Sequence, residues 1–137
     1  MFLGRHITSF QGKNRLVLVK KFRDELNNED RFYIIMGNNG EIWGYRVKDW
    51  LVEAQLRRSL PIEDSDGRKA RRFFFSRTEE CLLDSQGRFI IPQEFVDYAE
   101  LGDEILMVGA GDYFEIWDQS RFKNMMGSED RIPDKPE

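Results

Sequence analysis

Hydrophobic residues occur along the chain in short runs that polar turns separate, with two longer helical patterns in the middle. Short alternating or continuous apolar runs bounded by turn residues are typical of strands, and spacings of three and four residues are typical of helices. The predicted strands are 7–10, 16–19, 32–36, 41–45, 78–83, 89–92, 105–108 and 113–117. The predicted helices are 20–26, 47–60, 67–76, 93–98 and 119–126. This content predicts a mainly β fold with short helices, of the α+β class.

The apolar positions within these elements predict which side chains form the core. Strand 16–19 is uniformly apolar, so we expect it to be buried on both faces. In the helix at 47–60, the side chains expected to face the core are Val47, Trp50, Leu51, Ala54 and Leu56. In the helix at 67–76, residues 73–75 are expected to be buried and the basic residues 68–72 to be solvated.

Two parts of the chain match each other in order and in spacing. Arg15 matches Arg88 at a spacing of 73, and Gly37 matches Gly109 at a spacing of 72. We therefore expect residues 1–126 to form a single domain of two internal repeats, about 5–50 and 78–122, followed by a polar tail at 127–137. Units of this size cannot bury their own strands. The sequence thus predicts that the two copies interdigitate into one closed β-barrel with pseudo-two-fold symmetry and flanking helices.

Each repeat contains a polar turn that places an arginine at the start of a strand. In the second copy Asp84 precedes Arg88 by four residues, and in the first Gln11 precedes Arg15 by the same distance. Gly12, within the first turn, tolerates a positive φ. The arginine fork of donors matches guanine O6 and N7 or two phosphate oxygens, and a carboxylate across the turn can hold it extended. These turns are candidate DNA contacts.

The charge balance limits this interpretation. The net charge is −4 and the pI about 5.2, whereas nucleic-acid-binding domains are usually basic. A local excess of basic residues surrounds the first turn, and such a patch can neutralise phosphates. Its members are Arg5, Lys13, Arg15, Lys20, Lys21 and Arg23. A single arginine-bearing turn is more often an ordinary solvated hairpin. The candidate DNA-binding residues are Arg15, Arg88, Lys13, Gln11, Asp84 and Arg5.

Other kinds of chemistry find little support in the sequence. The one histidine, His6, and the one cysteine, Cys81, argue against a metal site and an intrachain disulfide. No nucleophile with a base and no phosphate-binding loop appears, so we expect no enzyme activity, no cofactor and no small-molecule substrate. No signal peptide or membrane span is apparent, which predicts a soluble cytoplasmic protein.

These motifs together resemble the MraZ family, bacterial regulators associated with the division and cell-wall gene cluster. The resemblance rests on the start Met1–Gly4, the turn Lys13–Arg15, the segment Asp84–Pro92 and the ending Phe114–Asp118. It extends from Met1 to about Met126, nearly the whole chain. The doubled turn combined with the Phe114–Asp118 ending is fairly specific.

The resemblance implies a swapped-hairpin β-barrel of the AbrB and SpoVT type, built from both halves of one chain. It also implies a ring of several subunits that binds promoter direct repeats in double-stranded DNA, mostly as a repressor, and hence a nucleoid-associated protein. The family's Asp-x-x-x-Arg signature maps onto Asp84 and Arg88. This chain departs from the family in the first copy, where Gln11 replaces the aspartate and Val19 the proline. An alternative is a protein-interaction or scaffolding ring whose DNA binding is weakened or lost.

Overall fold

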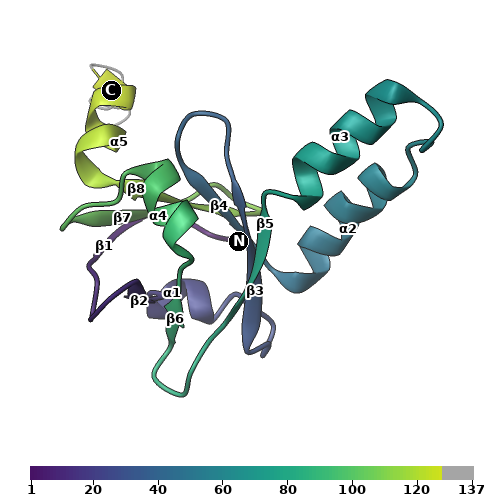
Figure 1. Ribbon diagram of the computed structural model, residues 1–137. Coiled ribbons are helices and arrows are strands. Elements are labelled where there is room, and N and C mark those ends of the chain that lie inside the picture. Colours follow the sequence, from purple (N-terminus) through teal and green to yellow (C-terminus); the bar gives the residue numbers. More distant parts are fainter. Residues whose placement is uncertain (128–137) are drawn as a thin grey trace, which may run out of the picture.

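A computed structural model of the chain describes residues 1–127, which form eight strands and five helices (Figure 1). The first half contains β1 (Arg5–Thr8), β2 (Arg15–Val17), α1 (Lys20–Arg23), β3 (Arg31–Met36), β4 (Ile42–Tyr45) and α2 (Val47–Arg58). The second contains α3 (Ser65–Phe75), β5 (Thr78–Leu82), β6 (Arg88–Ile90), α4 (Gln93–Ala99), β7 (Ile105–Gly109), β8 (Phe114–Asp118) and α5 (Gln119–Met126). The prediction of a mainly β fold with short helices is confirmed.

Strands from the two halves alternate within one antiparallel sheet. Its order is β1-β7-β8-β4-β3-β5, and β2 and β6 form a separate antiparallel ribbon. Exchanging each strand for its counterpart in the other half reproduces the same order, because β1, β3 and β4 correspond to β5, β7 and β8. This symmetry supports the two predicted repeats, which remain a prediction. Apart from Gly127, the predicted tail lies outside the described residues.

The predicted closed barrel is wrong for the described part of the chain, where the six-stranded sheet stays open with β1 and β5 at its edges. Closure would require β2 and β6 to continue the sheet beyond those edges. Both strands span only three residues, and a tight turn separates each of them from the edge strand that precedes it, β1 or β5. Their backbone groups pair with each other instead, so the ribbon lies across the open side of the sheet (Figure 1).

Aromatic side chains fill the space between the ribbon and the sheet. The ring of Phe114 on β8 lies 5.1 to 5.7 Å from the rings of Phe2, Phe22 and Phe32, all of them at most 1% exposed. Gly44 on β4 makes room for Phe114, since a Cβ there would lie 2.2 Å from the ring. Phe89 of the ribbon joins this cluster edge-on to Phe32 at 5.0 Å, so burial of aromatic area favours packing of the ribbon against the sheet.

The ribbon is buried on only one face, which corrects the prediction for strand 16–19. Leu16 and Leu18 are fully buried, whereas Val17 and Val19 are only half-buried. Successive side chains of a strand point to opposite faces, so covering one face by the core leaves the other accessible. The outer face of the ribbon is therefore available for function.

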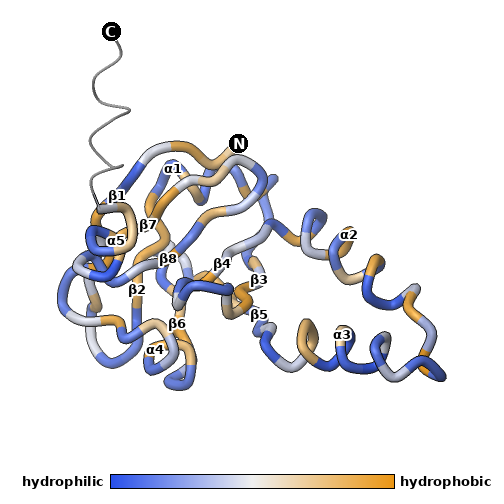
Figure 2. The backbone as a smooth tube through the Cα atoms, turned by 90° about the horizontal axis from the view of Figure 1, so that it is seen from above, coloured by the Kyte–Doolittle hydropathy of each residue, from blue (hydrophilic) through white to orange (hydrophobic). Residues whose placement is uncertain are grey.

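Helices α2 and α3 form a hairpin that projects from the sheet (Figures 1 and 2). Its base packs on the sheet face opposite the ribbon, where Trp50 stacks on Tyr33 at 4.1 Å and Ala54 is buried. The predicted core residues Leu51 and Leu56 are instead 53% and 58% exposed, and Phe73 is 54% exposed. Helix α2 buries one side only, and its opposite side is left without cover.

At the other end of the same sheet face, α5 packs Phe122 against Leu106 and Trp117. Together, α5 and the α2–α3 hairpin occupy the face of the sheet that the ribbon does not cover. Within residues 1–127, no helix is both long enough and apolar enough to cross a membrane.

Candidate nucleic-acid interface

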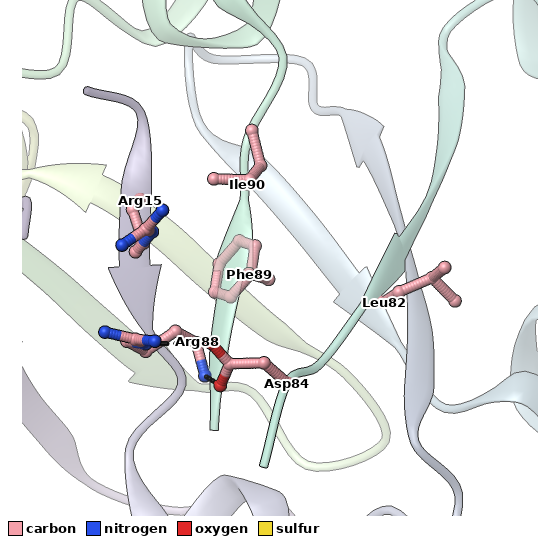
Figure 3. A pocket seen from close by; sticks show the side chains of 6 residues that line it. All are labelled: Arg15, Leu82, Asp84, Arg88, Phe89 and Ile90. Carbon is pink, nitrogen blue, oxygen red and sulfur yellow. Dashed lines mark hydrogen bonds and ion pairs between the residues drawn. The ribbon is translucent and has the colours of Figure 1, made fainter. Parts of the chain in front are cut away.

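The register of the ribbon decides which way its arginines point. Leu16 lies opposite Phe89, and both side chains are buried in the core. The flanking pairs, Arg15 with Ile90 and Val17 with Arg88, must then lie on the opposite, outer face. Figure 3 shows the guanidinium groups of Arg15 and Arg88 on this face, on adjacent strands. The structure thus brings together, on one surface, an arginine from each half.

Main-chain hydrogen bonds tie each turn to the opposite strand. Leu18 N–H donates to the carbonyl of Gly87 at 2.9 Å, and Ile91 N–H donates to the carbonyl of Asn14 at 2.8 Å. These two bonds extend the ribbon symmetrically at both ends. They fix the two turns relative to each other, so the distance between the arginine backbones is set by the fold.

Between the arginines lies a shallow hollow of about 160 Å³, lined by Arg15, Leu82, Asp84, Arg88, Phe89 and Ile90 (Figure 3). Ile90 is 55% exposed and Leu82 59% exposed, so apolar side chains accompany the charges on this face. Neither residue is among the candidates identified from the sequence. The alternation of Arg88, Phe89 and Ile90 could have indicated Ile90, because a buried Phe89 forces its neighbours outward.

In the second turn, Asp84 holds the arginine through its backbone and its side chain. Oδ1 accepts hydrogen bonds from the N–H groups of Gln86 and Arg88, both at 2.9 Å, and Oδ2 accepts one from Arg88 Nε at 2.8 Å. The backbone N–H and then the guanidinium of Arg88 lower the pKa of Asp84, which favours the ionised carboxylate. Gly87 has a φ of +76°, and a Cβ there would lie 2.2 Å from Arg23 Nη1.

The first turn has the same backbone closure without the carboxylate. Gln11 N–H donates to the carbonyl of Arg15 at 2.7 Å, as Asp84 N–H does to Arg88 at 2.9 Å. Asn14, at a φ of +58°, occupies the place of Gly87. Within residues 1–127, neither the Gln11 side chain nor the Arg15 guanidinium makes a hydrogen bond. The Gln11–Arg15 hydrogen bond that the chemistry would allow is not formed here.

The remaining candidates do not all lie on the arginine face. Lys13 is exposed at the tip of the first turn. Arg5, in contrast, lies 5.2 Å from the ring centre of Phe122, on the sheet face that carries α5. Within the expected basic patch, Lys20 pairs with Asp24 at 3.0 Å and Arg23 donates to the Leu18 carbonyl at 2.7 Å. The patch is therefore smaller than the sequence indicated.

Two observations concern side chains with reactive or metal-binding chemistry. Cys81 is 2% exposed, and its burial raises the pKa of the thiol. Within residues 1–127, no three His, Cys, Asp or Glu side chains are grouped so that they could hold a metal ion.

Comparison with known proteins places this geometry in a family. The model of a family described as "MraZ protein, putative antitoxin-like" matches residues 74–133, which include the Asp84–Arg88 turn. The protein named Transcriptional regulator MraZ of Moorella thermoacetica is 37% identical over 123 residues, 90% of this chain and 85% of the relative. Its namesakes in Pelotomaculum thermopropionicum and Clostridium acetobutylicum are 36% and 34% identical, over 93% and 89% of this chain and 86% and 84% of their own lengths. The chain therefore belongs to the MraZ family of transcriptional regulators.

Proposed function

We propose that the protein is a sequence-specific DNA-binding regulator that contacts double-stranded DNA through the outer face of the β2–β6 ribbon. The observation that carries this proposal is the display of Arg15 and Arg88 on one exposed surface, fixed by the ribbon register. Relatives bearing the name of a transcriptional regulator support a role at promoters.

The dimensions and chemistry of the ribbon suit the major groove. A two-stranded β-ribbon fits that groove, and arginine donates bidentate hydrogen bonds to guanine O6 and N7. Asp84 engages Nε of Arg88, which leaves the terminal guanidinium nitrogens available to a base or a phosphate. Because the side chain is held before binding, less conformational entropy is lost when Arg88 meets DNA.

A single ribbon offers two arginines, which would bind a duplex weakly. We propose that several copies form a ring and engage consecutive direct repeats, so that each bound ribbon raises the effective concentration of the next. By family resemblance, the target is the promoter of a cell-division and cell-wall gene cluster, the effect is repression, and the protein is nucleoid-associated. The net charge of −4 disfavours binding to unrelated DNA.

Substitution of each arginine tests this function. We expect Arg15→Ala and Arg88→Ala each to weaken binding to the DNA upstream of the protein's own gene by roughly 5- to 150-fold per contact. Fluorescence anisotropy at fixed salt measures the affinity, and light scattering checks that the assembled mass is unchanged. Lys123→Ala, an exposed cation on α5, is the control. Unchanged affinity in both arginine variants would refute the proposal.

A second candidate function is a protein-interaction or scaffolding ring with reduced DNA binding. The observation that favours it is the unsupported Arg15 side chain beside Gln11, which leaves the first turn less organised than the second. It predicts negligible affinity of the unmodified protein for any promoter DNA, together with a stable protein partner in pull-down experiments.

A further inference from the structure

Charge is distributed very unevenly over this fold. The stretch from Phe89 to Ser120 contains eight carboxylates and no lysine or arginine. The stretch from Arg46 to Arg77, which includes the α2–α3 hairpin, contains nine basic and five acidic residues. A chain with a net charge of −4 therefore carries one strongly acidic region and one basic region, each built from consecutive elements.

The acidic region includes a cluster at α4 and its connection to β7, which we call the acidic surface. Its members are Glu94, Asp97, Glu100, Asp103 and Glu104, all exposed. Within residues 1–127, none of them forms an ion pair with a basic side chain. Like charges at this density repel one another, so an external cationic partner would relieve them.

Some of the cations of the hairpin stabilise its own fold, and others make no ion pair. Arg71 donates to the Arg58 carbonyl at 2.9 Å and Arg68 donates to the Ile62 carbonyl at 2.6 Å, so these two stabilise the hairpin itself. Four further exposed cations have no ion pair within the described residues. They are Lys48, Arg58, Lys69 and Arg72.

Apolar side chains are exposed beside one of these cations, Lys48, on α2, whereas Lys69 and Arg72 lie on α3. Leu51, Val52 and Leu56 on α2 are 53 to 59% exposed, at spacings that place them together on one side of the helix. An exposed apolar cluster beside charged residues is typical of a protein-binding surface. The hairpin also packs on the sheet face opposite the ribbon, so a straight duplex bound by Arg15 and Arg88 would not reach it.

We propose that the exposed surface of the α2–α3 hairpin docks onto the acidic surface of a second copy of this chain. Charge complementarity identifies the partner, because the chain carries both the unpaired cations and the unpaired carboxylates. The two surfaces differ and lie in different parts of the molecule (Figures 1 and 2). The contact is therefore heterologous and repeats from copy to copy. The inference rests on the proposed assembly of several copies and assigns its interface.

Charge reversal tests the pairing. The double substitution Lys69→Glu with Arg72→Glu alters the hairpin, and Glu100→Lys with Glu104→Lys alters the acidic surface. We expect each double variant to lose assembly, with the mass by light scattering falling toward the 16.3 kDa of one chain at about 0.1 M salt. Lys123→Glu, on α5, is the matched control and retains the assembled mass. Circular dichroism checks that the exposed substitutions leave the fold intact.

Combining both reversals in one chain gives the decisive result. The reversed hairpin then meets a reversed acidic surface, so we expect the assembled mass to return. Unchanged mass in both double variants, or loss in both without recovery in the combined chain, overturns the proposed contact. A hairpin variant that keeps its mass but loses DNA affinity overturns it too, because the hairpin cations would then contact DNA.

A duplex shortened to one promoter repeat separates this proposal from the proposed function. We expect the charge-reversed variants to bind this duplex as the unmodified protein does, while Arg88→Ala loses affinity and retains its assembled mass. Loss of assembly with intact single-repeat binding supports both proposals. Intact assembly after charge reversal would refute the proposed interface. Intact DNA binding after Arg88→Ala would refute the proposed DNA contact.

Discussion

The two arginine-bearing turns of this protein have the same backbone and differ in what holds the arginine. Both close with a main-chain hydrogen bond across four residues, and both lead into a strand of the same ribbon. Asp84 accepts three hydrogen bonds in the second turn, whereas in the first turn the side chain of Gln11 makes none within residues 1–127. The shape of the turn thus does not depend on the carboxylate, but the orientation of the arginine side chain does.

This difference separates two requirements of the proposed DNA contact. The position of each arginine backbone comes from ribbon pairing and from Leu16 and Phe89 beneath it. The orientation of the arginine side chain before binding comes from a single neighbouring hydrogen-bond acceptor, which is Asp84 in the second turn. We expect substitutions that disturb the ribbon backbone to affect both turns together. Substitutions of the residue that holds an arginine side chain should affect one turn only.

The largest effect is expected for Phe89→Ala, which removes the side chain that anchors both turns. Phe89 is 2% exposed and packs edge-on against Phe32 at 5.0 Å. We expect a loss of about 3–5 kcal/mol in the free energy of unfolding, measured in urea. Ile90→Ala, at the next position but on the outer face, should stay within about 0.5 kcal/mol. Equal losses at the two positions would contradict the assigned register.

Asp84→Asn sharpens the comparison by making the second turn resemble the first. The amide can still accept backbone hydrogen bonds, but the ion pair to Arg88 Nε is lost. DNA binding must then order the Arg88 side chain, and the conformational entropy lost lowers DNA affinity roughly 2- to 10-fold, measured by anisotropy. Asp112→Asn, an exposed carboxylate after β7, should leave affinity unchanged. No difference between these variants would show that Arg88 needs no support.

Gln11→Asp makes the converse change, because it introduces into the first turn the carboxylate found in the second. We expect DNA affinity to rise by up to the factor lost in Asp84→Asn. Ser9→Asp adds the same charge outside the turn and should lower affinity slightly through repulsion of phosphate. If Gln11→Asp also lowers affinity, the first turn does not use its arginine as the second does.

The smallest expected effect is a pH dependence confined to the second turn. Hydrogen bonds from the Arg88 backbone and guanidinium lower the pKa of Asp84 in the folded protein. The resulting stability is present above the unfolded pKa of about 3.9 and is lost as pH falls through the lower folded value. In thermal unfolding, the difference between the unmodified protein and Asp84→Asn should therefore disappear in strong acid. Gln11→Asn should show no comparable change with pH, since neither residue titrates.

Local features of the fold were predictable from the sequence because they depend on neighbouring residues. The turn at Gly12 and Asn14, the strands and the helices follow from turn chemistry and from hydrophobic spacing. The family resemblance was confirmed, and with it the prediction that the chain is not an enzyme.

The features that could not be predicted depend on contacts between distant segments. Nothing local shows that β2 and β6 pair with each other and not with a strand of the six-stranded sheet, and this pairing leaves the sheet open. Leu51 and Leu56 fit a helical pattern of apolar residues. Helix α2 nevertheless packs against α3 and the sheet through its Trp50 and Ala54 side, which leaves both leucines exposed. Arg5 is near the first turn in sequence, yet β1 places it against α5.

Site-specific photo-crosslinking tests most directly whether DNA lies on the arginine face. Ile90 lies opposite Arg15 in the ribbon and is 55% exposed, while Leu51 on the hairpin is 53% exposed. A benzophenone amino acid replaces each residue in turn, and irradiation with labelled promoter DNA reports which surface contacts the duplex. The account predicts a crosslink from position 90 and none from position 51. Crosslinking from position 51 without any from position 90 would contradict it.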